Sequence, residues 1–154
     1  NAIHYIDLVN WMTGCNIVHV DCQGFEDWKP SKRSGFHDVQ GTLIISFGYE
    51  ISLELHSCKT GPYQPLIEIE TPEGIWLIDE NVGKAVGPSG QEIVGQITLQ
   101  SVLTAPLVEQ ILATGMCALP SLADSADQHR PFLDALLQHW NSNQSRQGLS
   151  VPIT

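Results

Sequence analysis

Residues 39–58, VQGTLIISFGYEISLELHSC, decide the fold, because they contain two apolar strand patterns separated by a short turn. In the second half, apolar and polar residues alternate strictly, and the polar side consists of Ser52, Glu54 and His56. A turn at residues 48–49 brings the two halves together as an antiparallel pair. The stretch therefore predicts a sheet with one buried face and one exposed face.

Strand patterns continue on both sides of this pair. Residues 17–25 and 65–80 are rich in Val, Ile, Leu and aromatic residues, with a TPEG turn inside the second run. Glu68 and Glu70 alternate with isoleucines there, so we expect them on an exposed face. Residues 81–95 are rich in glycine and are expected to form a loop or a ragged edge. Consecutive strands of this kind favour a mainly antiparallel sheet.

Helical patterns occupy the two ends of the chain. Residues 3–13 are apolar almost all round the helical wheel, which predicts a buried helix. A second helix is expected at 107–115, with Pro106 in its first turn. A third is expected to run to about residue 140, with Ser121 or Asp124 as its N-cap.

The order of helix, strands and helices predicts an α+β fold: an open, mostly antiparallel β-sheet with helices packed on one face. The length of 154 residues favours one domain over residues 1–154. No G-x-G-x-x-G sequence is present, so we expect no Rossmann domain in this chain. The sequence also contains no G-x-S-x-G nucleophile motif, which disfavours a hydrolase of that class.

Composition restricts the partners. Seven basic residues stand against 17 acidic ones, and the formal charge of −10 disfavours nucleic acid and anionic membranes. No segment approaches the roughly 20 apolar residues of a membrane-spanning helix. The four cysteines include no C-x-x-C pair, which favours free thiols. We therefore expect a cytoplasmic protein with no membrane association.

His4 is the most suggestive single residue for chemistry, because an imidazole titrates near neutral pH and can accept or donate a proton. Asp7 lies three residues later on the same helix face and could orient it. The alternative is that His4 is a hydrogen-bonded core residue. A metal site would need His19, His37 or His56 to converge from separate strands, so we expect no bound metal.

A second group of candidates lies in the loop predicted at residues 26–38. It contains the only basic cluster of the chain, with Lys29 and Arg33, beside Trp28, whose ring could stack on a sugar. The alternative is a solvated loop without a binding role. His129 lies where the last helix begins and is a further candidate for contact with a substrate.

The first helix also resembles a known motif. HYIDLVNWMTG, residues 4–14, is similar to the segment that opens the second domain of the Gfo/Idh/MocA oxidoreductases, the glucose-fructose oxidoreductase and inositol dehydrogenase family. The strand pair within residues 39–55 and the closing VPIT also resemble that domain. The likeness extends over essentially the whole chain, and only the first motif is specific.

This resemblance implies a function. His4 matches the histidine beside the reacting hydroxyl of the substrate, with Asp7 in support, and the loop carrying Trp28, Lys29 and Arg33 matches a region that often lines the substrate cleft. NAD or NADP would be bound mainly by a Rossmann domain that precedes this one. A catalytic lysine in a Glu-Lys-Pro segment would lie in that domain too, and this chain contains no such segment.

The resemblance further implies that the chain is the substrate-binding and oligomerisation domain of a two-domain dehydrogenase acting on a sugar or sugar-like molecule. Alone it would be inactive, and its open sheet face would pair in a homo-oligomer. Asn1–Ala2 resembles the remnant of a cleaved expression tag, and a native origin of this pair stays open. The alternative function is a non-catalytic α+β binding or scaffolding module.

Overall fold

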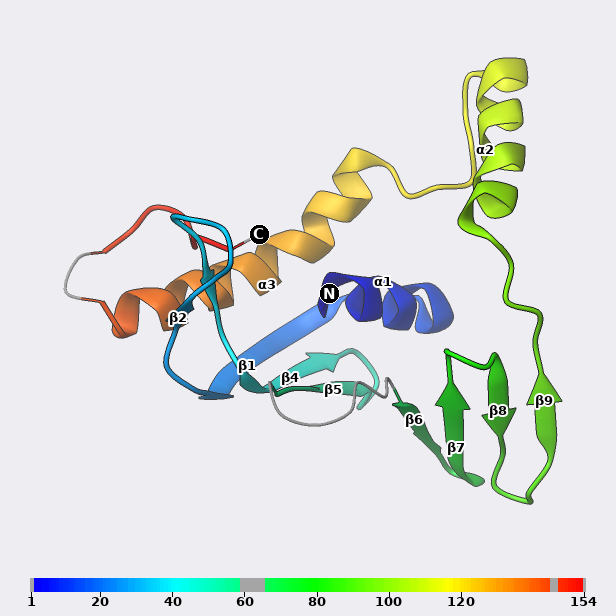
Figure 1. The fold of residues 1–154 in the computed structure, drawn as a ribbon, viewed down its shortest axis with the longest axis horizontal. Helices are drawn as coiled ribbons and strands as arrows, with labels where there is room; N and C mark the ends of the chain where they lie inside the picture. The colour runs from blue at the N-terminus through cyan, green and yellow to red at the C-terminus, as the bar shows by residue number, and fades with distance from the viewer. Residues whose placement is uncertain (1, 59–65, 145–146, 154) are drawn as a thin grey trace. The chain divides into compact units, whose positions relative to one another are not determined.

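The computed structural model describes residues 2–58, 66–144 and 147–153 (Figure 1). The chain forms two compact units, the first made of residues 1–60 and 120–154 and the second of residues 61–119. Both contain antiparallel sheets and helices, so the predicted α+β class is confirmed. That residues 1–154 act as one domain stays a prediction.

The sheet of the first unit is built around the strand pair within residues 39–58. Its strands β1 (Ile17–Phe25), β4 (Gly41–Phe47) and β5 (Ser52–Ser57) lie in the order β1-β4-β5 and are antiparallel. Leu43 pairs with Leu55 across β4 and β5. Because directly paired residues lie on the same face of a sheet, these leucines share the buried face. The hairpin predicted from the alternation is confirmed.

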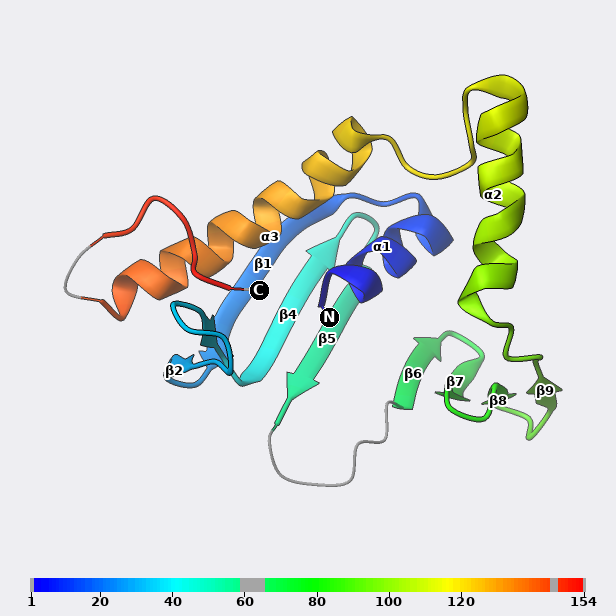
Figure 2. The same ribbon diagram turned by 45° about the horizontal axis from the view of Figure 1, so that its top comes forward.

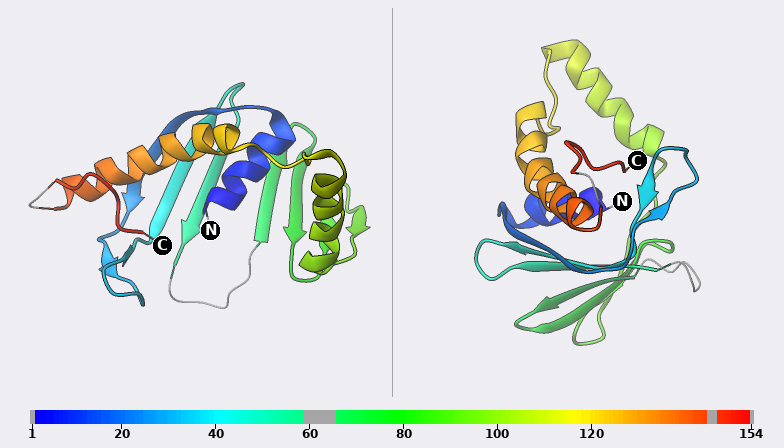
Figure 3. Two further views of the ribbon diagram at one scale, coloured as in Figure 1. Left: turned by 90° about the horizontal axis from the view of Figure 1, so that it is seen from above. Right: turned by 90° about the vertical axis from the view of Figure 1, so that its left-hand side faces the viewer.

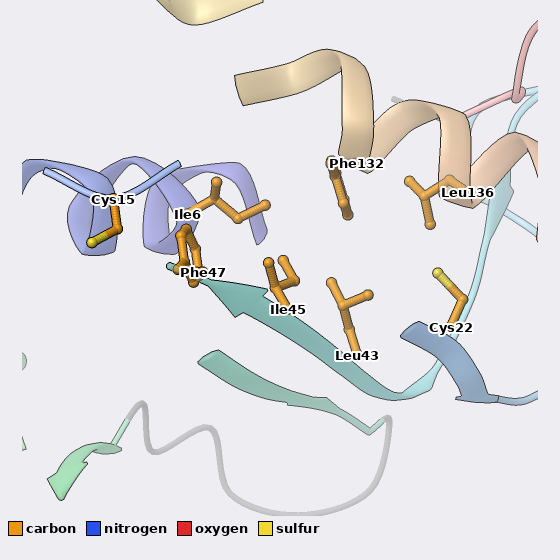
Figure 4. Close-up of a cluster of buried hydrophobic side chains, with 8 residues drawn as sticks. All are labelled: Ile6, Cys15, Cys22, Leu43, Ile45, Phe47, Phe132 and Leu136. Atoms are coloured by element: carbon orange, nitrogen blue, oxygen red, sulfur yellow. The ribbon is translucent and has the colours of Figure 1, made fainter. Parts of the chain in front are cut away.

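Helices α1 (Ala2–Thr13) and α3 (Leu122–Ser142) cover one face of this sheet (Figures 2 and 3). Between helices and strands lies a core of buried side chains, shown in Figure 4: Ile6, Cys15, Cys22, Leu43, Ile45, Phe47, Phe132 and Leu136. The opposite face of the sheet carries the polar residues of β5, which are exposed as predicted.

The expectation that the first helix is buried is wrong for most of α1. Ile6 is its one fully buried residue, whereas Trp11 is 82% exposed. The reason is geometric, since a helix lying on one sheet turns only one stripe of side chains toward it. The end of the helix follows expectation: Gly14 adopts a left-handed φ of 70°, and its N–H donates to the carbonyl of Asn10 at 2.7 Å.

The start of α3 is fixed by a capping box. Ser121 is the N-cap, its hydroxyl accepts from the N–H of Asp124, and the Asp124 carboxylate accepts from the N–H of Ser121. Of the two N-caps that the sequence left open, the structure has Ser121, and Asp124 lies three residues later in the first turn. The Ser121 hydroxyl donates to the Asp124 carboxylate at 2.7 Å, and this bond, followed by the bond from the Ser121 N–H, holds the pKa of Asp124 below its ordinary value.

The second unit contains a four-stranded antiparallel sheet. Its strands follow chain order: β6 (Leu66–Thr71), β7 (Gly74–Asp79), β8 (Lys84–Val86) and β9 (Glu92–Val94). The first two match prediction, and their glutamates at 68 and 70 are exposed. The loop expected at 81–95 contains β8 and β9. The glycines there punctuate two short strands rather than preventing them.

Helix α2 (Gln100–Thr114) completes the second unit and begins earlier than predicted. Pro106 therefore lies inside the helix rather than in its first turn. A proline there leaves the carbonyl of Val102 without its helical partner, and the exposure of Val102 lets water satisfy that carbonyl. No helix in the described ranges is both long and apolar enough to span a bilayer.

Candidate functional site

His4 lies in the first turn of α1 with its side chain exposed. The alternative of a hydrogen-bonded core histidine is therefore excluded. Asp7 is half-buried one turn further along the helix, and the described atoms show no hydrogen bond or ion pair between the two side chains. The orienting role of Asp7 stays a prediction, while His4 is accessible to a substrate or to another domain.

The loop predicted at 26–38 contains a small ribbon. Strands β2 (Lys29–Pro30) and β3 (His37–Asp38) pair in antiparallel fashion directly after Trp28. The indole of Trp28 is half-buried, and its Nε1–H donates to Nδ1 of His139 on α3 at 3.0 Å. This contact joins two segments separated by 111 residues along the chain.

An aromatic cluster surrounds this hydrogen bond. The Trp28 ring lies edge-on to Trp140 at a centroid distance of 5.2 Å, and Trp140 in turn lies 4.8 Å from the ring of His37. Phe25 at the end of β1 lies edge-on to His139 at 5.4 Å. These contacts favour a rigid arrangement, because edge-to-face aromatic pairs have preferred geometries. The cluster fixes the ribbon against the last turns of α3.

The hydrogen bond from Trp28 also fixes the protonation of His139. An indole N–H is only a donor, so Nδ1 of His139 must be the acceptor and the neutral ring carries its proton on Nε2. Burial lowers the pKa of His139. Protonation of Nδ1 would also break the bond to Trp28. At neutral pH the imidazole is therefore uncharged and presents Nε2–H as a donor.

A pocket of about 400 Å³ opens beside this histidine. Its lining residues are Phe25, Glu26, Asp27, Lys29, His139 and Asn143. The Lys29 ammonium lies 3.3 Å from Oε2 of Glu26, and both side chains are at least half exposed, so this ion pair adds little stability. The pocket combines an aromatic wall with groups that donate and accept hydrogen bonds.

The residues predicted for the site are therefore divided. Lys29 lines the pocket, whereas Trp28 is not a lining residue and contacts the pocket residue His139 instead. Arg33 lies exposed in the turn of the ribbon, and His4 is not among the lining residues. His129 precedes His139 by ten residues, which corresponds to about 15 Å along an α-helix, and its Nδ1 contacts the carbonyl of Ser125 at 2.6 Å. Binding of substrate by these residues stays a prediction.

Sequence analysis did not single out His139 or Asn143. One sequence feature could have indicated His139: it is adjacent to Trp140 near the end of the last helix, where side chains can contact neighbouring loops. The hydrogen-bond partner of His139 could not be predicted, because its contact with Trp28 depends on how the β2-β3 ribbon packs against α3. Long-range pairs of this kind carry no local pattern.

The open sheet face offers a second polar surface. Nε2 of His56 lies 3.0 Å from Oε1 of Glu54, and its Nδ1 lies 3.0 Å from the hydroxyl of Thr42. Within the ranges that the structure describes, no three His, Cys, Asp or Glu side chains lie close enough to hold a metal ion.

Comparison with known proteins adds no identity. Neither a protein family, nor a curated protein, nor a solved structure was found to match the chain.

Proposed function

We propose that this chain is the substrate-binding and oligomerisation domain of an NAD(P)-dependent oxidoreductase that acts on a sugar or sugar-like hydroxyl. The observation that carries the proposal is the HYIDLVNWMTG helix, which ends at Gly14 and holds His4 exposed at its start. A histidine kept for packing would be buried, whereas one that serves a substrate must be accessible. The α+β architecture is consistent with the resemblance.

The chemistry assigned to His4 is proton transfer. When hydride leaves a carbinol carbon for a nicotinamide, the proton of the hydroxyl must also leave, and an imidazole within hydrogen-bond reach accepts it. In the reverse direction the same imidazole returns the proton. His4 is the proposed catalytic residue, and Asp7 is the proposed positioning residue.

The nicotinamide would be held mainly by another domain. Every strand pair in the described ranges is antiparallel, so these residues offer no βαβ unit for a dinucleotide. In this proposal the cofactor supplies the hydride acceptor, and this chain supplies substrate contacts and the proton acceptor. A cytoplasmic location is part of the same proposal.

Self-association is assigned to the open face of the β1-β4-β5 sheet. Ile44, 39% exposed, lies there beside Glu54 and His56, so the face combines an apolar centre with polar partners. Ile44→Asp is expected to shift sedimentation toward the monomer. A sedimentation profile that is monomeric for the unaltered chain at high concentration would contradict this part of the proposal.

The experiment compares this 154-residue chain with its full native gene product, each incubated with NAD⁺ or NADP⁺ and a panel of sugars and cyclitols. The gene product is expected to reduce a nicotinamide, and the 154-residue chain alone is not. Reduction by the chain alone, or a native gene without a G-x-G-x-x-G unit, would overturn the proposal. Ligand binding without turnover by the gene product would favour the non-catalytic module.

A further inference from the structure

Residues 28–38, which form the β2-β3 ribbon and the tryptophan before it, are joined to helix α3 by one side-chain hydrogen bond within the described residues, from Trp28 to His139. Backbone bonds hold this segment elsewhere. The N–H of Glu26 donates to the carbonyl at position 40, and the N–H of His37 donates to the carbonyl of Pro152, each at 2.8 Å. Of these bonds, only the one to His139 depends on a group that titrates near neutral pH.

The bond from Trp28 exists in one protonation state of His139. The neutral ring accepts at Nδ1, whereas an imidazolium donates from both nitrogens and accepts at neither. The indole N–H of Trp28 is half-buried, so the loss of its acceptor is unfavourable. A cation–π attraction across the ring-centroid distance of 5.9 Å offsets part of this loss without restoring the bond. Protonation therefore removes the directional contact between ribbon and helix.

The pocket wall offers the protonated ring other partners. Glu26 and Asp27 line the same pocket as His139, and so does Lys29, whose ammonium lies 3.3 Å from the Glu26 carboxylate. The two carboxylates outnumber the single ammonium, so the wall attracts a cation. The neutral ring is thus held by Trp28, and the imidazolium is drawn toward the carboxylates. Two sets of contacts, each favoured by one protonation state, are the basis of a pH switch.

The remaining titratable and charged groups of this region leave the bond unaffected. His37 lies on another side of the cluster, with its ring 4.8 Å from that of Trp140, and its Nδ1 is buried without a hydrogen-bond partner. Protonation of His37 therefore breaks no side-chain hydrogen bond to the helix. Asp38 is exposed on β3. The residues of α3 at 135–142 and the C-terminal residues 147–153 contain no Asp, Glu, Lys or Arg.

We propose that His139 is a pH-dependent switch, whose neutral ring holds the β2-β3 ribbon on α3 through Trp28 and whose protonated ring releases it. The ribbon side of the pocket carries Lys29, and the helix side carries His139 and Asn143, so release changes the shape of the pocket. Burial lowers the pKa of His139, which places the release on the acid side of the ordinary histidine pKa. The ribbon is therefore held at neutral pH.

The test follows the indole Nε1–H resonance of Trp28 by NMR in the ¹⁵N-labelled 154-residue chain from pH 8 to pH 5, with Trp28→Phe to assign it. The resonance should move upfield as the hydrogen bond is lost, in one step with a midpoint below the ordinary histidine pKa. The ring protons of His139 should titrate with the same midpoint. Nuclear Overhauser contacts between the rings of Trp28 and His139 should weaken in the same step.

Two variants of His139 separate the bond from the charge. His139→Asn places an amide oxygen near the position of Nδ1, so the indole resonance should keep its neutral-pH position throughout the titration. His139→Phe removes the acceptor, so the resonance should lie at its acid position already at pH 8. Exchange of the indole proton with water at pH 7 should be about three- to tenfold faster in His139→Phe than in the unaltered chain.

His37→Gln is the matched control, because it removes the other histidine of the aromatic cluster and should keep the transition. Unchanged amide resonances of β1, β4 and β5 show that each variant is folded. A static indole resonance, ring contacts retained in full at pH 5, a transition that persists in His139→Asn, or one that is lost in His37→Gln overturns the inference. These measurements involve neither His4 nor a cofactor, so they are independent of the proposed function.

Discussion

Ile45 offers the most demanding test of the fold. Its side chain is 0% exposed at the centre of β4, where it pairs with Leu53 on one side and Val20 on the other. Ile45→Ala removes three buried carbon atoms and leaves a cavity between the sheet and its helices. Substitutions of this kind cost about 2–5 kcal/mol. With an m-value of about 2 kcal/mol per molar, the urea midpoint should fall by about 1–2.5 M.

The neighbouring residue supplies a matched control. Ile44→Ala makes the same chemical change in the same strand, but Ile44 is 39% exposed on the open face, so its cost should stay near 1 kcal/mol or below. Both variants are unfolded in urea in a Trp76→Phe background, at low protein concentration. Fluorescence then reports on the first unit, which holds the three remaining tryptophans, Trp11, Trp28 and Trp140. Equal midpoint shifts for the two variants would refute the assigned strand orientation.

Three further predictions follow from single contacts. Ser121→Ala removes the capping box of α3 and should lower the free energy of unfolding by about 0.5–2 kcal/mol in urea titrations, whereas an unchanged midpoint would contradict the cap. Burial lowers the pKa of His139, so the unfolded chain binds a proton at higher pH than the folded chain, and the free energy of unfolding should fall as pH drops below about 6.5. His139→Gln should reduce this dependence of stability on pH, and an equal dependence in both proteins would contradict the lowered pKa. Burial and then the charge of Asp21 raise the pKa of Cys22 to about 11, so iodoacetamide at pH 7.5 should label Cys22 far more slowly in the native protein than in urea. Equal labelling rates, measured by mass spectrometry, would show that the Cys22 thiol is not buried.

Much of the fold could be predicted because its signals are local. Strict alternation placed Ser52, Glu54 and His56 on an exposed face, and Gly14 ended the first helix where a left-handed residue was required. Both features depend on neighbours within a few residues. The short strands β8 and β9 escaped prediction, because a strand of three residues is too brief for alternation to be distinguished from a loop.

The candidate site could be predicted only in part. Trp28 and Lys29 stood out by residue type, but the acceptor for the indole is His139, 111 residues later. The apolar composition of α1 predicted burial, yet Trp11 is largely exposed, because the number of faces that a helix buries is set by its neighbours. Composition states what a helix is able to bury, and tertiary packing decides what it does bury.

The central claim is that His4 moves the proton of a substrate hydroxyl during nicotinamide reduction, and its most direct test is the rate of that reduction by the native gene product carrying His4→Gln. Glutamine retains hydrogen bonding but cannot accept the proton, so kcat should fall about 10²- to 10⁴-fold. KM should change little. A His4→Gln enzyme with unchanged kcat would contradict the account.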